Sequence, residues 1–156
     1  MKYLELPILS ILILCVSCGG PAEEETPTGA VKAFFRAVAR SENDVEATKE
    51  VVRLLSPQAQ QQLRKRAELA STLTGREFAP QDMIPKGRLF LRYQPRMHKP
   101  FVEHISGNHA LVTIYGEKKA ETSTLRLLKS GNAWRIDLPL PPLESRASTE
   151  PARSLR

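Results

Sequence analysis

The sequence predicts an α+β domain, in which three N-terminal helices pack on a curved antiparallel sheet of four to five strands. Between residues 27 and 74, apolar residues recur at the 3.6-residue spacing of amphipathic helices. From residue 88 onward they alternate with polar residues, which is typical of strands that pack on one face. Two Ser-Gly-Asn triplets divide this second half, and Gly-Asn favours two-residue hairpin turns. Helices and strands are therefore segregated along the chain, as in α+β folds.

Capping signals delimit the three helices. Thr26 followed by a proline begins the first helix, Asp44 begins the second, and Ser56 followed by a proline begins the third, which ends at Gly75. One face of each helix is apolar. The residues of these faces are Val31, Phe34, Phe35, Val38 and Ala39 in the first helix, Val45, Thr48, Val51, Val52 and Leu55 in the second, and Ala59, Leu63, Arg66, Ala67, Ala70 and Leu73 in the third.

The outward face of residues 58–65 is polar and is expected to be solvated surface.

Alternation predicts strands at residues 88–94, 101–106, 109–116, 122–129 and 133–138. A two-residue loop at Gly131-Asn132 places the large apolar residues of the last two strands on one face, with the exception of Leu128. The same register puts Arg126 opposite Asp137 on the other face, where a cross-strand ion pair is expected.

One polar residue falls on the predicted apolar face of the sheet. With Gly107 in a two-residue turn, Glu103 lies opposite Val112 and points inward. An unpaired charge is very costly to bury, so this carboxylate needs a partner, a proton or water. Either Glu103 lines a ligand pocket, with Tyr115 and Arg92 as further candidate pocket residues, or it lies at a frayed edge or meets a basic side chain such as Arg92.

A leader precedes the folded region. Residues 6–16 are apolar but fall short of the ~20 residues that a helix needs to cross a bilayer. Ser17 then precedes Cys18, and this ending resembles a lipobox, in which a small residue precedes the cysteine that receives diacylglycerol. The resemblance implies that residues 1–17 are a lipoprotein signal peptide and that Cys18 becomes a lipidated N-terminus. An ordinary secretory signal and an uncleaved anchor are the alternatives.

The rest of the chain divides into three zones. Residues 18–27 are rich in Gly, Pro and Glu and are expected to form the lipidated cysteine and a flexible tether. Residues 28–143 carry the periodic pattern of the folded domain, and residues 144–156 are expected to be a disordered tail. Cys15 and Cys18 also spell a C-x-x-C pair, but cleavage before Cys18 would separate them, so no redox site is expected.

Composition and motifs restrict the function classes. The chain is 41% hydrophobic and 26% charged, with a formal net charge of +6, as in a single basic globular domain. Aromatic residues make up 6%, and no nucleic-acid reader motif occurs, so no nucleic-acid partner is expected. Phosphate loops, nucleophile elbows and zinc-ligand spacings are also absent from the sequence, and neither a cofactor nor a metal is expected.

A family resemblance follows from three pieces of the sequence. These are residues 27–39, the Leu54-Leu55-Ser56-Pro57 junction, and the final hairpin through Trp134-Arg135-Ile136. Together they resemble the nuclear transport factor 2-like superfamily, and within it small bacterial lipoproteins that carry a domain of unknown function. The resemblance implies a cone-shaped α+β fold with a cavity. This fold hosts isomerases, dehydratases, ligand binders and oligomerisation modules, so it does not by itself assign an activity.

The expected function is that of a lipid-anchored, non-catalytic domain of the cell envelope that binds a small ligand, a wall component or a protein partner. It would sit on the cell membrane or outer membrane and face the periplasm or the exterior. The alternative is a cavity enzyme of the isomerase or dehydratase type, centred on Glu103 with Tyr115 or His104 as helpers. Homodimers through an open sheet face are common in the family that the chain resembles, and Leu111, Thr113, Tyr115 and Leu128 could supply such a face here.

Overall fold

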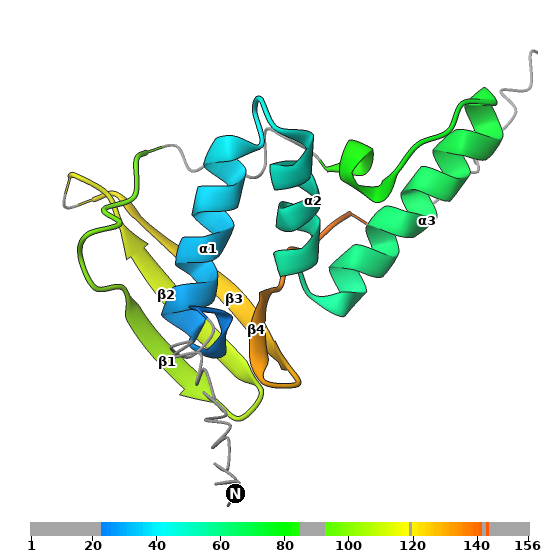
Figure 1. The fold of residues 1–156 in the computed structure, drawn as a ribbon. Coiled ribbons are helices and arrows are strands. Elements are labelled where there is room, and N and C mark those ends of the chain that lie inside the picture. The colour runs from blue at the N-terminus through cyan, green and yellow to red at the C-terminus, as the bar shows by residue number, and fades with distance from the viewer. Residues whose placement is uncertain (1–22, 85–92, 119, 142, 144–156) are drawn as a thin grey trace, which may run out of the picture.

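The computed structural model describes residues 23–84, 93–118, 120–141 and 143, and it confirms the α+β class (Figure 1). The helices are α1 (Pro27–Arg40), α2 (Val45–Leu54) and α3 (Pro57–Thr74), with the short 3-10 helices η1 (Glu23–Glu25) and η2 (Pro80–Met83). The strands β1 (Val102–Ser106), β2 (His109–Tyr115), β3 (Thr122–Ser130) and β4 (Ala133–Ile136) form one antiparallel sheet in that order. Within these residues, no helix has the length and apolar character that crossing a membrane requires.

The helix limits confirm the capping signals. The Thr26 side chain accepts a hydrogen bond from the backbone N–H of Gly29 at 3.1 Å, at the N-terminus of α1. Asp44 caps α2 in the same way, and Ser56 caps α3. Gly75 ends α3 with a φ of 68°, in the left-handed region that favours glycine.

Both Ser-Gly-Asn triplets form the two-residue turns that the sequence predicts. Ser106 pairs with His109 and Ser130 pairs with Ala133 across the two turns. Each turn glycine has a positive φ, as in hairpin turns with glycine at the first central position. The cross-strand ion pair is also confirmed, since Arg126 Nη2 lies 3.0 Å from Asp137 Oδ2.

The strand predicted at residues 88–94 lies mostly outside the described residues. Its described end, Tyr93 and Gln94, is not part of a strand. The Tyr93 hydroxyl nevertheless donates a hydrogen bond to the carbonyl oxygen of Ile114 at 3.2 Å, so this segment contacts the end of β2.

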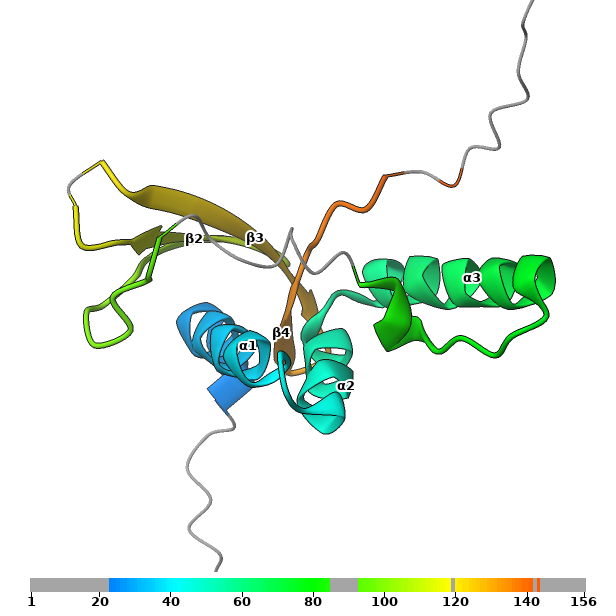
Figure 2. The same ribbon diagram turned by 90° about the horizontal axis from the view of Figure 1, so that it is seen from above.

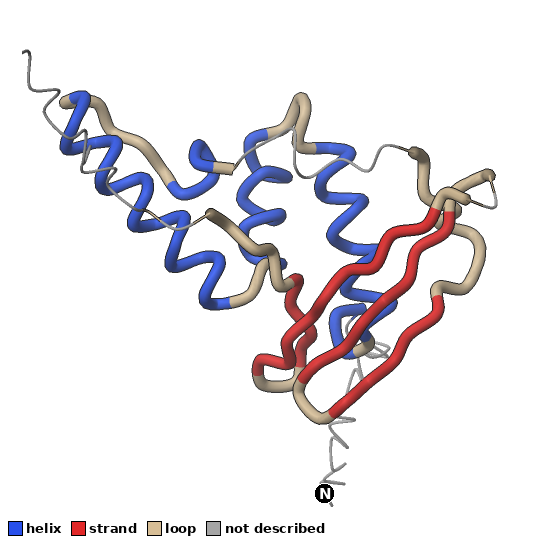
Figure 3. The backbone as a smooth tube through the Cα atoms, turned by 180° about the vertical axis from the view of Figure 1, so that it is seen from behind, coloured by secondary structure: helices blue, strands red, loops and turns tan. Residues whose placement is uncertain are grey.

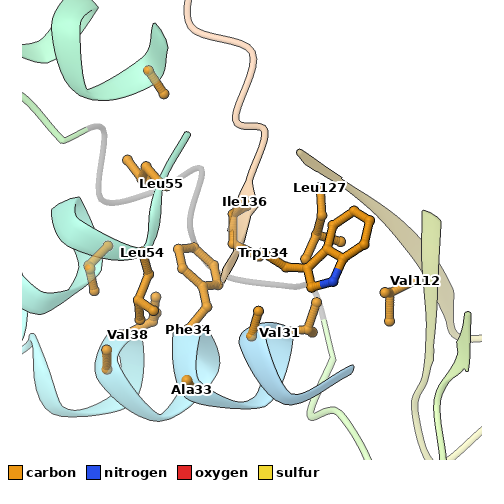
Figure 4. Packing of buried hydrophobic residues seen from close by; sticks show 14 of the residues in the cluster. Val31, Ala33, Phe34, Val38, Leu54, Leu55, Val112, Leu127, Trp134 and Ile136 are labelled. Atoms are coloured by element: carbon orange, nitrogen blue, oxygen red, sulfur yellow. The ribbon is translucent and has the colours of Figure 1, made fainter. Parts of the chain in front are cut away.

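The core lies between the helices and the inner face of the sheet (Figures 2 and 4). Trp134, Leu127 and Val112 from the sheet pack with Val31 and Phe34 of α1, and all five side chains are buried. Burial of this apolar surface is the main source of stability for a domain of this size.

The end of α2 is joined to the sheet at β4. Leu55 forms a parallel bridge with Ile136, and the N–H of the fully buried Ser56 donates to the Ile136 carbonyl oxygen at 2.8 Å. The start of α3 is therefore fixed by a backbone hydrogen bond to the last strand.

Two residues of the expected apolar helix faces are exposed, because they lie at helix ends away from the core. Helix α3 projects beyond the edge of the sheet (Figures 1 and 2), and Leu73 near its end is 75% exposed. Val45, at the first position of α2, is 65% exposed, while Ala47 and Leu54 are buried. Periodicity predicts which face of a helix is apolar, but not how much of that face other elements cover.

Candidate functional site

The short helix η1 is attached to the rest of the fold by ion pairs. Glu24 accepts hydrogen bonds from Arg53 of α2, at 2.7 Å and 3.1 Å, and also from Arg135 of β4. The Glu24 side chain is 17% exposed and that of Arg135 is 19% exposed, whereas Arg53 is 53% exposed. The hydrogen bond from Arg53, together with that from Arg135, holds the pKa of Glu24 below its ordinary value of 4.5, against the opposing effect of burial.

A second set of contacts holds η1 against α1. Glu23 forms an ion pair with Arg36. A Cβ atom at Gly29 would overlap the carbonyl oxygen of Glu23 and would lie 2.7 Å from Oγ1 of Thr26. Glycine is therefore needed at this helical position, because the chain before α1 passes directly over the first helical turn.

Residues 23–27, the described part of the segment 18–27 that is expected to be a flexible tether, are therefore attached to the folded domain. The acidic run suggests an extended, solvated chain when composition alone is considered. In the structure its first two carboxylates meet arginines from α1, α2 and β4. These partners lie up to 111 residues away along the chain, so no local signal identifies them.

Glu103 faces the helix side of the sheet, in the predicted register opposite Val112. Its carboxylate oxygen Oε2 accepts hydrogen bonds from the backbone N–H of Thr28 at 3.1 Å and from the Thr28 hydroxyl at 2.8 Å. Thr28 lies in the first turn of α1, where backbone N–H groups have no helical acceptor and a negative charge is favourable. Glu103 is exposed at the edge strand β1, so the carboxylate satisfies a helix end close to solvent.

The remaining candidate pocket residues are not brought to Glu103. Tyr115 and His104 alternate with the inward-facing residues of their strands, and they lie on the outer face of the sheet. Arg92 lies outside the described residues. The structure therefore does not bring Glu103 and Tyr115 together.

The histidines are scattered over the surface. His98, His104 and His109 are all exposed. In the part of the chain that the structure describes, no group of three or more His, Cys, Asp or Glu side chains is arranged to hold a metal ion.

A shallow, open hollow on α3 is lined by Pro57, Gln58, Gln61, Arg64, Lys65 and Glu68. These residues belong to one exposed helix face, on which Glu68 follows Arg64 and Lys65 by one helical turn. The local charges are therefore partly balanced, and the face has the character of solvated helix surface.

No described helix covers the outer face of the sheet, since α1 and α2 lie on the other side and α3 projects beyond the sheet edge (Figures 2 and 3). Three positions on this face combine exposure with apolar character: Val102 on β1, and Leu111 and Tyr115 on β2. Thr113, between the last two, lies opposite Val102 and Thr124. Exposed apolar residues gathered on one face are typical of interaction surfaces.

Comparison of the chain with models of known protein families finds no match, and comparisons with curated proteins and with solved structures find none either.

Proposed function

We propose that this protein is a bacterial lipoprotein, anchored through Cys18, whose domain is a cone of the nuclear transport factor 2-like type that works as a non-catalytic module of the cell envelope. The observation that carries the proposal is the apolar stretch of residues 6–16 that ends in Ser17-Cys18, directly before a folded domain. Two helices, α1 and α2, on one side of an antiparallel sheet, with α3 beyond its edge (Figure 2), are compatible with such a cone.

The contacts of Glu103 support the non-catalytic part of the proposal. Its carboxylate is engaged by two hydrogen bonds from Thr28. A general acid or base must instead reach a substrate proton and should be supported by a second polar group in the site. Tyr115 and His104, the two helpers considered for such a site, lie on the opposite face of the sheet.

Mass spectrometry of the mature protein tests the anchor. In a bacterial host, the purified protein should begin at Cys18 and carry the added mass of diacylglycerol. Cys18→Ser should retain the full leader, because the modified cysteine is what the signal peptidase recognises. Cys15→Ser is the matched control and should be processed normally, since Cys15 leaves with the leader. An intact leader on the wild-type chain, or a mature terminus without acyl chains, would refute the proposal.

The outer sheet face is the proposed contact surface for a second copy of the chain. Val102, Leu111 and Tyr115 would supply the apolar centre, and the threonines around them a polar rim. Leu111→Arg should convert the dimer to a monomer in sedimentation equilibrium with density-matched detergent. Leu69→Arg, at an equally exposed leucine on α3, should leave the mass unchanged. A monomeric wild type would exclude this contact.

A further inference from the structure

We propose that one pole of the domain lies against the lipid surface that holds the anchor. This anchor-side pole consists of η1 and the two hairpin turns at Gly107-Asn108 and Gly131-Asn132. The inference rests on the proposed lipidation of Cys18 and adds an orientation and an interaction surface to it. Its partner is the headgroup layer of the bilayer.

The length of chain between the anchor and the fold limits where the domain can lie. Only residues 19–22 separate Cys18 from Glu23, where the described fold begins. An extended chain advances about 3.4 Å per residue, so Glu23 lies within about 17 Å of the Cys18 Cα atom. A tether that continued to residue 28 would allow about 34 Å. The attachment of η1 therefore halves the available reach.

This reach is short compared with the size of the domain and of the membrane interface. Each headgroup layer is about 5–8 Å thick, so roughly 10 Å of the reach remains above the headgroups. A domain of this length has a radius of gyration of about 13 Å, so it cannot turn its far side toward the bilayer. Glu23 therefore stays within about 10 Å of the headgroups, and the elements beside it are the ones placed to meet the lipid.

The two hairpin turns lie at the same end of the molecule as η1 (Figures 1 and 3). The N–H of Lys129 donates to the carbonyl oxygen of Asn108 at 2.8 Å, which places the second turn beside the first. Helix η1 contacts β4, the strand that leaves the second turn, through the ion pair of Glu24 with Arg135. The pole is thus one continuous surface, and the sheet extends away from it.

The chemistry of the pole fits a headgroup layer. Its turns expose glycine and asparagine amides, and Lys129 adds a cation whose amine lies 5.9 Å from the Trp134 ring centre. Ile105, two residues before Gly107 of the first turn, is 49% exposed and adds an apolar side chain. The three residues of η1 are glutamates; Glu23 and Glu24 are paired with arginines, and Glu25 is exposed. The pole therefore presents amides, charges of both signs and an isolated apolar residue, which suit the mixed polarity of a zwitterionic membrane interface.

The orientation also assigns a role to the open sheet face. Because the strands begin or end at the pole, they run away from the bilayer, and the outer face with Leu111 and Tyr115 is turned sideways. It remains available to a partner on the same membrane.

Fluorescence quenching on vesicles tests the orientation. The full-length lipidated protein is reconstituted into phosphatidylcholine vesicles with a headgroup-linked quencher, and a single dye is placed by Asn132→Cys at the pole or by Lys118→Cys at the far end. The nine residues of β3 separate these ends by about 27 Å, so quenching should be at least about twofold stronger at position 132. Equal quenching at the two positions, in protein that floats with the vesicles, would overturn the proposed orientation.

A charge-matched pair of variants tests whether η1 sets the reach. Glu24→Gln removes the ion pairs to Arg53 and Arg135, and it should reduce the difference between positions 132 and 118. Glu25→Gln makes the same charge change at an exposed residue with no ion pair among the described residues, and it should behave as wild type. Arg135→Met, which removes the less exposed of the two arginine partners of Glu24, is the second disruption if Glu24→Gln does not fold. An unchanged difference in a folded variant that lacks this contact would refute the role of η1.

Flotation separates this inference from the proposed function on which it rests. Protein that fails to float and carries no acyl mass on Cys18 refutes the anchor, and the orientation with it. Protein that floats and carries the acyl mass leaves the anchor established, so that only the quenching pattern decides the orientation.

Discussion

Of the two arginines that pair with Glu24, the less exposed one should contribute more to the free energy of unfolding. A double-mutant cycle measures the coupling free energy of each pair. Two hydrogen bonds from Arg53 are the largest cause of the lowered Glu24 pKa. Arg53 is nevertheless 53% exposed, so solvent screens its effect on the free energy of unfolding. Arg135 is 19% exposed and contacts the same carboxylate. Burial therefore favours Arg135 as the stronger partner.

The expected magnitudes follow from these exposures. A charged hydrogen bond that is largely buried costs about 1.5–3 kcal/mol when one partner is removed. An exposed pair is worth about 0.2–1 kcal/mol. We expect a coupling free energy of about 1.5 kcal/mol between Glu24→Gln and Arg135→Met, and of about 0.5 kcal/mol between Glu24→Gln and Arg53→Gln.

Urea unfolding gives both coupling energies. Trp134 is the single tryptophan of the chain and is buried, so its fluorescence reports loss of the core, and far-UV circular dichroism provides the second probe. Coincident transitions by the two probes would justify two-state free energies. A larger coupling to Arg53 than to Arg135, or no coupling to either, would refute the argument from burial.

Three further predictions concern the same end of the domain. Because the folded pKa of Glu24 is lowered, its contribution is complete well above pH 4.5 and is lost as the pH falls through the folded pKa, so the difference in unfolding free energy between wild type and Glu24→Gln should shrink below pH 4.5. Gly29→Ala should lower the urea midpoint although alanine favours helices, because its Cβ overlaps the Glu23 carbonyl oxygen; a raised midpoint would contradict this close approach. Glu103→Ala should cost about 1 kcal/mol in urea unfolding, since the Thr28 donors lose their acceptor, and Glu103→Gln should cost less; a stabilised alanine variant would count against the helix-end role.

The parts of the fold that depend on local signals are those that the sequence predicts best. Helix ends at Thr26, Asp44 and Ser56 need only a side chain and the next three residues. The sheet register follows from two-residue turns, and once Gly131 begins the second turn the ion pair of Arg126 with Asp137 is determined.

Contacts between distant parts of the chain are where the sequence is insufficient. Alternation correctly turns Glu103 toward the helices, but the Thr28 donors that it meets are 75 residues away. Similarly, an acidic run before a helix indicates a tether, and nothing near it identifies Arg135 as a partner. Electrostatic partners depend on which elements meet in space, and periodicity within one element does not contain that information.

The N-terminal segment can attach through Glu24 only after the rest of the domain has folded, because its partners lie on distant elements. Glu24 contacts the second helix and the last strand at once, so its site exists only when the helix layer and the sheet have assembled. Before assembly, the chain between Cys18 and the first helix would have the reach of an unfolded tether. The orientation proposed for the lipidated protein is therefore a property of the folded state alone. Loosening the bridge of Leu55 with Ile136, which joins the residue after α2 to β4, should release the orientation as removing Glu24 does.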